Sequence, residues 1–141
     1  HIMKDEYYTL TGYKLKEKQE LSNAMEDYLE MIYRLQKEKE EVHIKDLATS
    51  LNVKYSSVTK MMYRLQDKGL IIFKNYNPIK LTETGKRLGF YLLYRHNILV
   101  RFMKFINKDD YNLSSVEKIE HFIDFKTIQN IESLLNRINN E

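Results

Sequence analysis

Three side chains that can ligate a metal ion lie close together in the C-terminal part of the chain. Glu117, Glu120 and His121 stand at positions i, i+3 and i+4 of the stretch VEKIEHFIDF, residues 116–125. Apolar residues recur through this stretch at helical spacing, which predicts an amphipathic helix. The two carboxylates and the imidazole then share one face of that helix. Groups of this kind repel or compete with one another unless a cation lies among them.

Two further acids and a second histidine are candidates for the same chemistry. Asp27 and Glu30 share one face of a predicted helix that begins at Ser22 or Asn23, and the apolar residues of this helix indicate that it is packed. His96 lies in the otherwise apolar run YLLYRHNILV, where an imidazole needs a partner such as a backbone carbonyl or a cation. For any one of these residues alone, a solvated acid or a hydrogen-bonded histidine is the alternative interpretation.

If the acids and histidines converge, they form a ligand set of four carboxylates and two imidazoles without sulfur. Such ligands suit Mn²⁺ or Fe²⁺ and do not exclude Zn²⁺ or Co²⁺. One divalent ion balances four negative charges badly, so two ions that share carboxylates are expected. The six candidate ligands are Asp27, Glu30, His96, Glu117, Glu120 and His121.

The middle of the chain predicts a helix-turn-helix followed by a hairpin. Two short helical stripes are separated by Asn52, and Gly69 suits the position after the second helix, where a positive φ is favoured. Two short strands follow at 70–73 and 79–81, joined by KNYNP. A β-hairpin directly after the second helix is the wing of a winged helix-turn-helix.

A helix-turn-helix reads DNA with the N-terminal residues of its second helix, which reach base edges in the major groove. Lysine and hydroxyl side chains bond to bases or phosphates, and tyrosine packs on a thymine methyl group. The candidates on this helix are Lys54, Tyr55, Ser56, Ser57, Thr59 and Lys60. The candidates for flanking phosphate contacts are Lys45, Arg64, Lys74 and Lys80. For each lysine alone the alternative is a solvated surface charge, but the order of the elements favours DNA binding.

The distribution of charge agrees with a polyanionic partner. The net charge is +3, yet residues 43–104 carry twelve Lys and Arg against three Asp and Glu, a balance of +9. Each flank has a balance of −3. A basic middle between acidic ends favours nucleic acid over a membrane or a small organic substrate.

The chain is expected to be mainly α with a small β-wing, in three segments. These are an N-terminal arm at 1–21, flexible or loosely docked, a winged helix-turn-helix domain at 22–83, and a helical metal-binding and dimerisation domain at 84–141. The helices predicted in the last segment are 84–107, 114–123 and 127–139.

The absence of cysteine excludes disulfides and thiolate metal sites, and it agrees with a cytoplasmic protein. No run of 18 apolar residues is present to span a membrane.

Several motifs resemble those of the diphtheria toxin repressor family. AMEDYLEMIYRL, VKYSSVTKMMYRL, LTETGKRLG, LLYRH and VEKIEH occur in the order and spacing of that family, over residues 22–139. The resemblance is greatest to its manganese-responsive branch, because the iron-responsive branch has sulfur ligands at the positions of Asp27 and Glu120. It implies a homodimeric, Mn²⁺-activated repressor of metal-uptake genes, with all six ligand positions filled. Fe²⁺, Co²⁺, Zn²⁺ and Cd²⁺ are expected substitutes. The chain departs from the family pattern at Tyr55, where proline is common, and at a wing tip without glycine, so the operator sequence does not follow from the resemblance.

Three alternatives stay open at this point. The chain could be an iron- or zinc-responsive regulator of the same family, or a metal-independent winged-helix regulator with solvated acids. A di-metal enzyme is the third alternative, since clusters of carboxylates and histidines also catalyse hydrolysis. Against an enzyme, EKIEH lacks the first histidine of the H-x-x-E-H metalloprotease pattern, and no substrate-loop motif is found.

Overall fold

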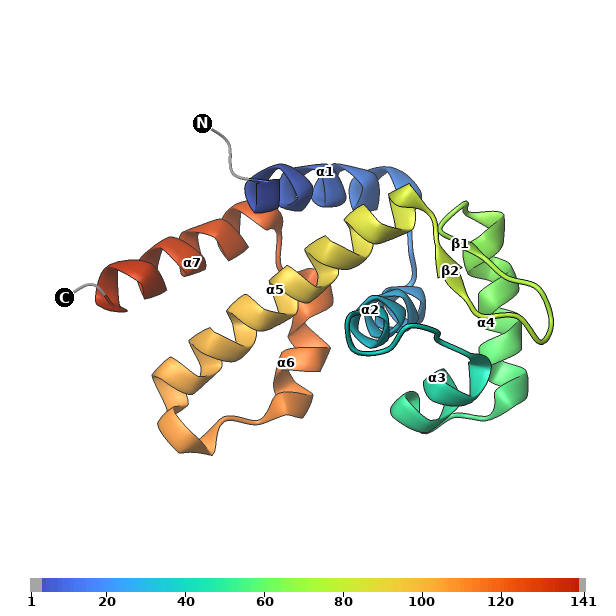
Figure 1. The fold of residues 1–141 in the computed structure, drawn as a ribbon. Helices are drawn as coiled ribbons and strands as arrows, with labels where there is room; N and C mark the ends of the chain where they lie inside the picture. Colours follow the sequence, from blue (N-terminus) through green and yellow to red (C-terminus); the bar gives the residue numbers. More distant parts are fainter. Residues whose placement is uncertain (1–3, 140–141) are drawn as a thin grey trace. The chain divides into compact units, whose positions relative to one another are not determined.

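Residues 4–139 are described by a computed structural model (Figure 1). The chain divides into two compact units, with the division between Leu93 and Tyr94. Both units are mainly helical, and the described residues hold one two-stranded sheet, which lies in the first unit. The predicted fold class is therefore confirmed. The division falls inside the long helix α5 (Glu83–Asn107), and not before it as the sequence suggested. The first three residues of the predicted arm and the last two of the predicted C-terminal domain lie outside the described residues.

The helix-turn-helix of the first unit contains α2 (Asn23–Glu38), α3 (Ile44–Leu51) and α4 (Tyr55–Asp67). Ser22 caps α2, because its hydroxyl accepts a hydrogen bond from the backbone N–H of Met25 at 3.1 Å. Asn52 ends α3 with a left-handed φ of 53°, which turns the chain toward α4, as predicted. The apolar faces of these helices supply the core of the unit, which includes Leu29, Ile32, Leu47, Val58, Met62 and Leu65.

The turn before α3 is held by Asp46. Its carboxylate accepts a hydrogen bond from the backbone N–H of His43 at 2.8 Å and forms an ion pair with Lys39. The hydrogen bond from Lys39 is the main reason why the pKa of Asp46 lies below its ordinary value, with a further contribution from the His43 N–H. A negative charge in the first turn of α3 also interacts favourably with the positive end of the helix dipole.

The predicted wing is an antiparallel hairpin of β1 (Ile71–Ile72) and β2 (Lys80–Leu81), shorter than the sequence suggested. Gly69 leads into it with a φ of 73°, which glycine adopts without strain. Val42 extends the ladder, since its carbonyl accepts a hydrogen bond from the N–H of Ile79 at 2.7 Å. The hairpin is thereby fixed to the segment between α2 and α3.

The segment expected to be a flexible or loosely docked arm forms helix α1 (Lys4–Gln19) beside the first part of α5 (Figure 1). A Cβ atom on Gly12 would lie 2.3 Å from the carbonyl oxygen of Arg87 and 2.6 Å from Cβ of Tyr91, so glycine permits this close approach. The rings of Tyr13 and Tyr91 pack edge to face at 5.8 Å. The sequence did not predict this packing, because the apolar residues of α1 do not recur at regular helical spacing. The contact between α1 and α5 depends instead on one glycine and on edge-to-face packing of aromatic rings.

Polar contacts also attach α1 to the helix-turn-helix. Lys16 Nζ lies 3.6 Å from the buried carboxylate of Glu26 on α2. Lys68, at the end of α4, donates a hydrogen bond from Nζ to the carbonyl oxygen of Gln19, the last residue of α1, at 3.1 Å. α1 is thus a part of the first unit.

The second unit contains the last part of α5, followed by four short elements. These are η1 (Lys108–Asp110), α6 (Leu113–Ile119), η2 (Glu120–Phe122) and α7 (Phe125–Asn139), where η1 and η2 are 3₁₀ turns. Its core is formed by Ile98, Leu99, Val116 and Ile128. Asp124 caps α7 by accepting from the N–H of Thr127 at 3.0 Å, and hydrogen bonding with Thr127 lowers the pKa of its carboxyl. Among the described residues, no helix has the length and apolar character that crossing a membrane requires.

The predicted continuous helix over 116–125 is wrong. α6 ends at Ile119, Glu120 to Phe122 form the 3₁₀ turn η2, and Ile123 is extended. A 3₁₀ turn has three residues per turn, so it rotates side chains away from the helical stripe that the spacing suggested. Phe122, which we expected in the apolar stripe, is 79% exposed, and Phe125 is buried at the start of α7.

Candidate DNA-binding surface and metal centre

The start of α4 presents most of the side chains that the sequence suggested for reading DNA. Tyr55 is 57% exposed. The other exposed candidates here are Lys54, Ser56, Ser57 and Lys60. Thr59 is half-buried, and its hydroxyl donates to the carbonyl of Tyr55 at 3.0 Å, so this hydroxyl has an acceptor within the helix. The N-terminus of a helix with adjacent lysines attracts phosphate.

The flanking basic residues are exposed and lie at different edges of the first unit. Lys45 of α3 lines a hollow of about 380 Å³ with Tyr55, Thr59 and Tyr76, so the structure brings α3, α4 and the hairpin together here. Lys74 and Lys80 line a different hollow, of about 820 Å³, whose other lining residues include two acids, Glu40 and Glu41. Arg64 is exposed farther along α4 and lines neither hollow.

The sequence analysis missed the tip of the hairpin as a part of this surface. Tyr76 is fully exposed and has a φ of 68°, a left-handed conformation that is uncommon for tyrosine. Asn75 and Asn77 on either side of it line the same hollow as Lys45. The signal was present in the run KNYNP, where polar residues around an aromatic ring join two strands.

In the second unit, a histidine and a carboxylate from distant positions form a buried pair. Nδ1 of His96 on α5 lies 2.9 Å from Oε2 of Glu120 in η2. His96 is 7% exposed and Glu120 is 2% exposed. Ligand atoms of Glu120 and His121 lie within 4.8 Å of one another. The structure therefore brings together three of the six predicted ligands inside one unit.

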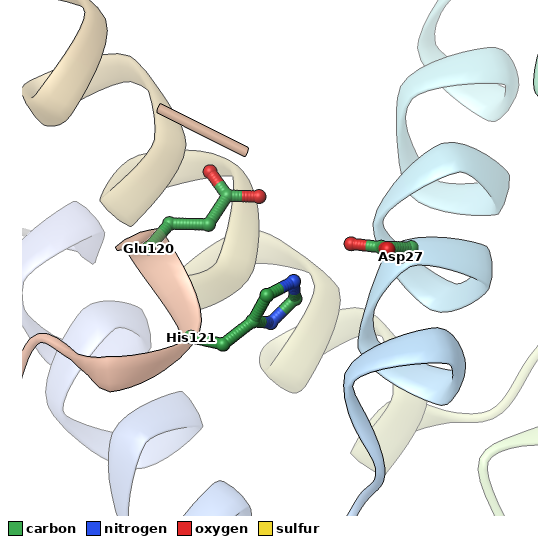
Figure 2. Close-up of side chains that lie close together, drawn as sticks. All are labelled: Asp27, Glu120 and His121. Atoms are coloured by element: carbon green, nitrogen blue, oxygen red, sulfur yellow. The ribbon is translucent and has the colours of Figure 1, made fainter. Parts of the chain in front are cut away.

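Figure 2 shows the side chains of Glu120 and His121, which project from the short turn η2. It also labels the side chain of Asp27, which belongs to α2. Glu117 is exposed on α6, one turn earlier. No group of ligand-type side chains found in the described part of the chain includes it. Glu117 belongs to the α-helix α6, whereas Glu120 and His121 belong to the 3₁₀ turn η2, which begins at Glu120.

The two predicted ligands of the first unit lie on α2. Asp27 is exposed, whereas Glu30 is buried and forms an ion pair with Arg34 one turn later. The carboxylate of Glu30 thus has a positive partner within its own helix. Glu26, which the sequence analysis did not single out, is also buried on this helix and has Lys16 as its partner.

The donor set fits a divalent cation. Within the second unit, Glu120 is paired with His96, and one of its ligand atoms lies within 4.8 Å of one of His121. These side chains offer two imidazoles and a carboxylate, and the chain has no cysteine to add a thiolate. Carboxylate and imidazole ligands bind Mn²⁺, Fe²⁺, Co²⁺ and Zn²⁺. A hydrogen bond between a histidine and a carboxylate also fixes the orientation of the ring, as in many metal sites.

The chain is similar to known regulators along most of its length. Residues 20–79, from the start of the helix-turn-helix to the hairpin, match the family described as "Iron dependent repressor, N-terminal DNA binding domain". The HTH-type transcriptional regulator MntR of Shouchella clausii (strain KSM-K16) is 42% identical over 113 residues, which are 79% of this chain and 79% of that protein. This chain belongs to the diphtheria toxin repressor family. The family makes it a metal-dependent, DNA-binding transcriptional regulator and not an enzyme.

Solved structures agree with the family fold. The structure of the manganese regulator SloR matches with a TM-score of 0.66. The structure of ScaR with bound Zn²⁺ matches with a TM-score of 0.60. Each is 24% identical to this chain, and each match covers 79% of this chain and 53% of the other. This chain thus spans about half the length of the SloR and ScaR chains. A hypothetical protein from Sulfolobus solfataricus matches with a TM-score of 0.57 at 23% identity, over 83% of this chain and 91% of the other. At these identities the likeness shows the fold alone.

Proposed function

We propose that this member of the diphtheria toxin repressor family is a Mn²⁺-dependent repressor, which binds operator DNA as a homodimer and controls metal-uptake genes. The observation that carries the proposal is the buried pair of His96 and Glu120 with His121 beside it, a set of oxygen and nitrogen ligands without sulfur. The name of the 42% identical relative, MntR, supports manganese.

The proposed metal site uses all six candidate ligands. We expect two ions per subunit that share carboxylates, with Fe²⁺, Co²⁺, Zn²⁺ or Cd²⁺ as substitutes. Mn²⁺ binds weakly in the Irving–Williams order, so selectivity must come from geometry and response more than from affinity. The proposed ligands are Asp27, Glu30, His96, Glu117, Glu120 and His121.

The location of these residues in the sequence suggests how metal controls DNA binding. Asp27 and Glu30 lie on α2 in the first unit, which also holds the proposed DNA-binding helix α4. His96, Glu120 and His121 lie in the second unit. A bound divalent cation supplies the positive charge that lets carboxylates from both units come together. Each DNA-binding unit then loses orientational freedom, and this lowers the entropic cost of binding DNA.

The homodimer is supported by the second unit. Its exposed large apolar side chains are Phe105, Ile106, Leu113, Phe122 and Leu134. Exposed apolar residues are common one at a time, but several in one small unit favour burial against another chain. In a dimer, each α4 would enter a major groove, and successive grooves on one side of B-DNA are about 34 Å apart.

The DNA contacts are proposed from exposed positions of the first unit and from the half-buried Thr59. Lys54, Tyr55, Ser56, Ser57, Thr59 and Lys60 would face the bases at the start of α4. Lys45, Arg64, Lys74 and Lys80 would neutralise phosphates on either side.

Fluorescence anisotropy of a labelled DNA duplex tests the proposal. The duplex is first recovered from a random-sequence pool by the Mn²⁺-loaded protein, and binding is then measured with Mn²⁺, Fe²⁺, Co²⁺, Zn²⁺ or a chelator. Mn²⁺ should tighten DNA binding by a coupling free energy of ~1–3 kcal/mol or more, and the duplex should tighten Mn²⁺ binding equally. Equal DNA affinity with and without Mn²⁺ would refute metal control.

An iron-responsive regulator is the second candidate, and the description of the matched family as an iron dependent repressor favours it. The same titration separates the two. Activation by Fe²⁺ at concentrations where Mn²⁺ has no effect would favour the second candidate.

A further inference from the structure

Arg95 is a buried guanidinium next to the candidate metal ligands of the second unit. It is fully shielded from solvent and directly precedes His96 on α5. Its Nη2 atom lies 3.5 Å from Nδ1 of His121. Arginine keeps its charge in proteins, and burying that charge is costly unless negative or hydrogen-bonding groups surround it. A permanent positive charge is therefore built in among groups that suit a cation.

The groups near Arg95 are the ones that a divalent ion would use. His121 offers Nδ1 to the guanidinium, and a ligand atom of Glu120 lies within 4.8 Å of one in His121. Oε2 of Glu120 lies within hydrogen-bond distance of Nδ1 of His96, at 2.9 Å. A ring nitrogen that accepts a hydrogen bond from arginine uses the lone pair that a metal would need.

We propose that Arg95 acts as a resident counter-cation that positions His121 in the metal-free protein and lowers the affinity of the site for divalent metal. This inference rests on the proposed metal site. The positive charge of Arg95 offsets part of the negative charge of the site in the metal-free protein. The same charge repels an incoming divalent ion and competes for Nδ1 of His121. Arg95 thus raises the metal concentration at which the regulator responds.

The sign of the effect follows from Coulomb's law. Two like charges a few ångströms apart repel strongly at the effective dielectric constant of a protein interior. Neutralising Arg95 removes this repulsion for the metal-loaded form and removes a stabilising partner from the metal-free form. Metal affinity should rise, while the stability of the metal-free protein should fall.

Four variants of the full chain test this inference. Arg95→Met is apolar and close in size, Arg95→Gln is neutral but can still donate a hydrogen bond, and Arg95→Lys keeps the charge. Arg101→Gln is the matched control, because Arg101 lies on the same helix and contacts Asn136 at 3.2 Å. The free Mn²⁺ concentration is followed by electron paramagnetic resonance, and melting temperature is measured with and without Mn²⁺.

Both neutral variants should bind Mn²⁺ at least about tenfold more tightly than the wild type, and should melt at a lower temperature only without metal. Arg95→Lys and Arg101→Gln should bind within about threefold of the wild type. If Arg95→Met does not fold, Arg95→Gln decides the result. Unchanged or weaker Mn²⁺ binding in a folded neutral variant would overturn the inference, as would equal destabilisation with and without Mn²⁺.

His96→Ala separates this inference from the proposed function. If His96→Ala binds Mn²⁺ like the wild type, the proposed metal site is wrong. If His96→Ala loses Mn²⁺ binding while the neutral Arg95 variants bind it no more tightly than the wild type, only the role of Arg95 is wrong.

Discussion

Nδ1 of His96 and Oε2 of Glu120 lie 2.9 Å apart, although 24 residues separate them in the chain. This pair connects α5 to η2 inside the second unit, and both side chains are buried. A buried hydrogen bond between an imidazole and a carboxylate fixes both groups. The second unit therefore holds the pair in place without metal.

Glu120→Gln should weaken Mn²⁺ binding by at least about tenfold, because the amide keeps a hydrogen-bonding oxygen but loses the negative charge that attracts the ion. Isothermal titration calorimetry with Mn²⁺ measures the change. Glu17→Gln is the matched control, since Glu17 is an exposed acid of helix α1 and is not a proposed ligand. If Glu17→Gln weakens Mn²⁺ binding as much as Glu120→Gln does, the role assigned to Glu120 is wrong.

Asp27→Met should broaden the metal response toward Fe²⁺. Asp27 offers a hard carboxylate oxygen from α2, whereas a thioether is a soft ligand that disfavours Mn²⁺. The measurement is DNA-binding anisotropy under anaerobic conditions with Fe²⁺ or Mn²⁺ in turn. An unchanged order of metals in the folded variant would count against a role of this residue in selectivity.

Lys60→Ala should weaken DNA binding and leave Mn²⁺ binding unchanged. Lys60 is exposed on α4. If Lys60 contacts a base, its loss should cost ~1–3 kcal/mol of DNA-binding free energy. If it contacts a phosphate, its loss should lower the salt dependence of DNA affinity by about one charge. Anisotropy at several salt concentrations distinguishes the two. Lys118→Ala, which removes an exposed lysine from α6, should have no effect on DNA binding. A parallel loss of Mn²⁺ binding in Lys60→Ala would indicate misfolding.

The helix-turn-helix and its wing could be predicted because their signals are local. Ser22 caps α2, Asn52 ends α3, and Gly69 precedes the hairpin with a positive φ, each as its residue type suggested. Caps and positive φ angles act within a few residues, so one sequence suffices to find them. The long helix α5 followed from its sustained apolar periodicity for the same reason.

The rest depended on contacts between distant residues, which periodicity does not report. The spacing of Glu117 and Glu120 suggested a common helical face, but the chain tightens into a 3₁₀ turn at Glu120. Arg95 was not singled out, because nothing in the local sequence reveals that its guanidinium lies beside His121. The pairing of His96 with Glu120 became visible only once α5 and η2 were placed in one unit.

Gly12→Ala should destabilise the first unit, although alanine favours helix over glycine by about 1 kcal/mol. The new methyl group would lie 2.3 Å from the carbonyl oxygen of Arg87, and overpacking of this kind costs ~1–3 kcal/mol. Urea unfolding monitored by circular dichroism measures the change. Leu10→Ala, at a position 42% exposed on the same helix, is the control and should have a smaller effect. A stabilised Gly12→Ala variant would mean that α1 does not pack on α5.

Asp46→Asn should lower the free energy of unfolding near neutral pH by up to about 1 kcal/mol, because asparagine can still accept from the His43 N–H but cannot pair with Lys39. The pKa of Asp46 is lowered in the folded protein, chiefly by Lys39, so its stabilising effect is present above the ordinary value of 3.8 and is lost as pH falls through the lower folded value. Urea unfolding of both proteins over this pH range should show the difference shrinking toward zero in acid. A difference between wild type and Asp46→Asn that persists in acid would mean that the amide destabilises the turn by some means other than the lost charge.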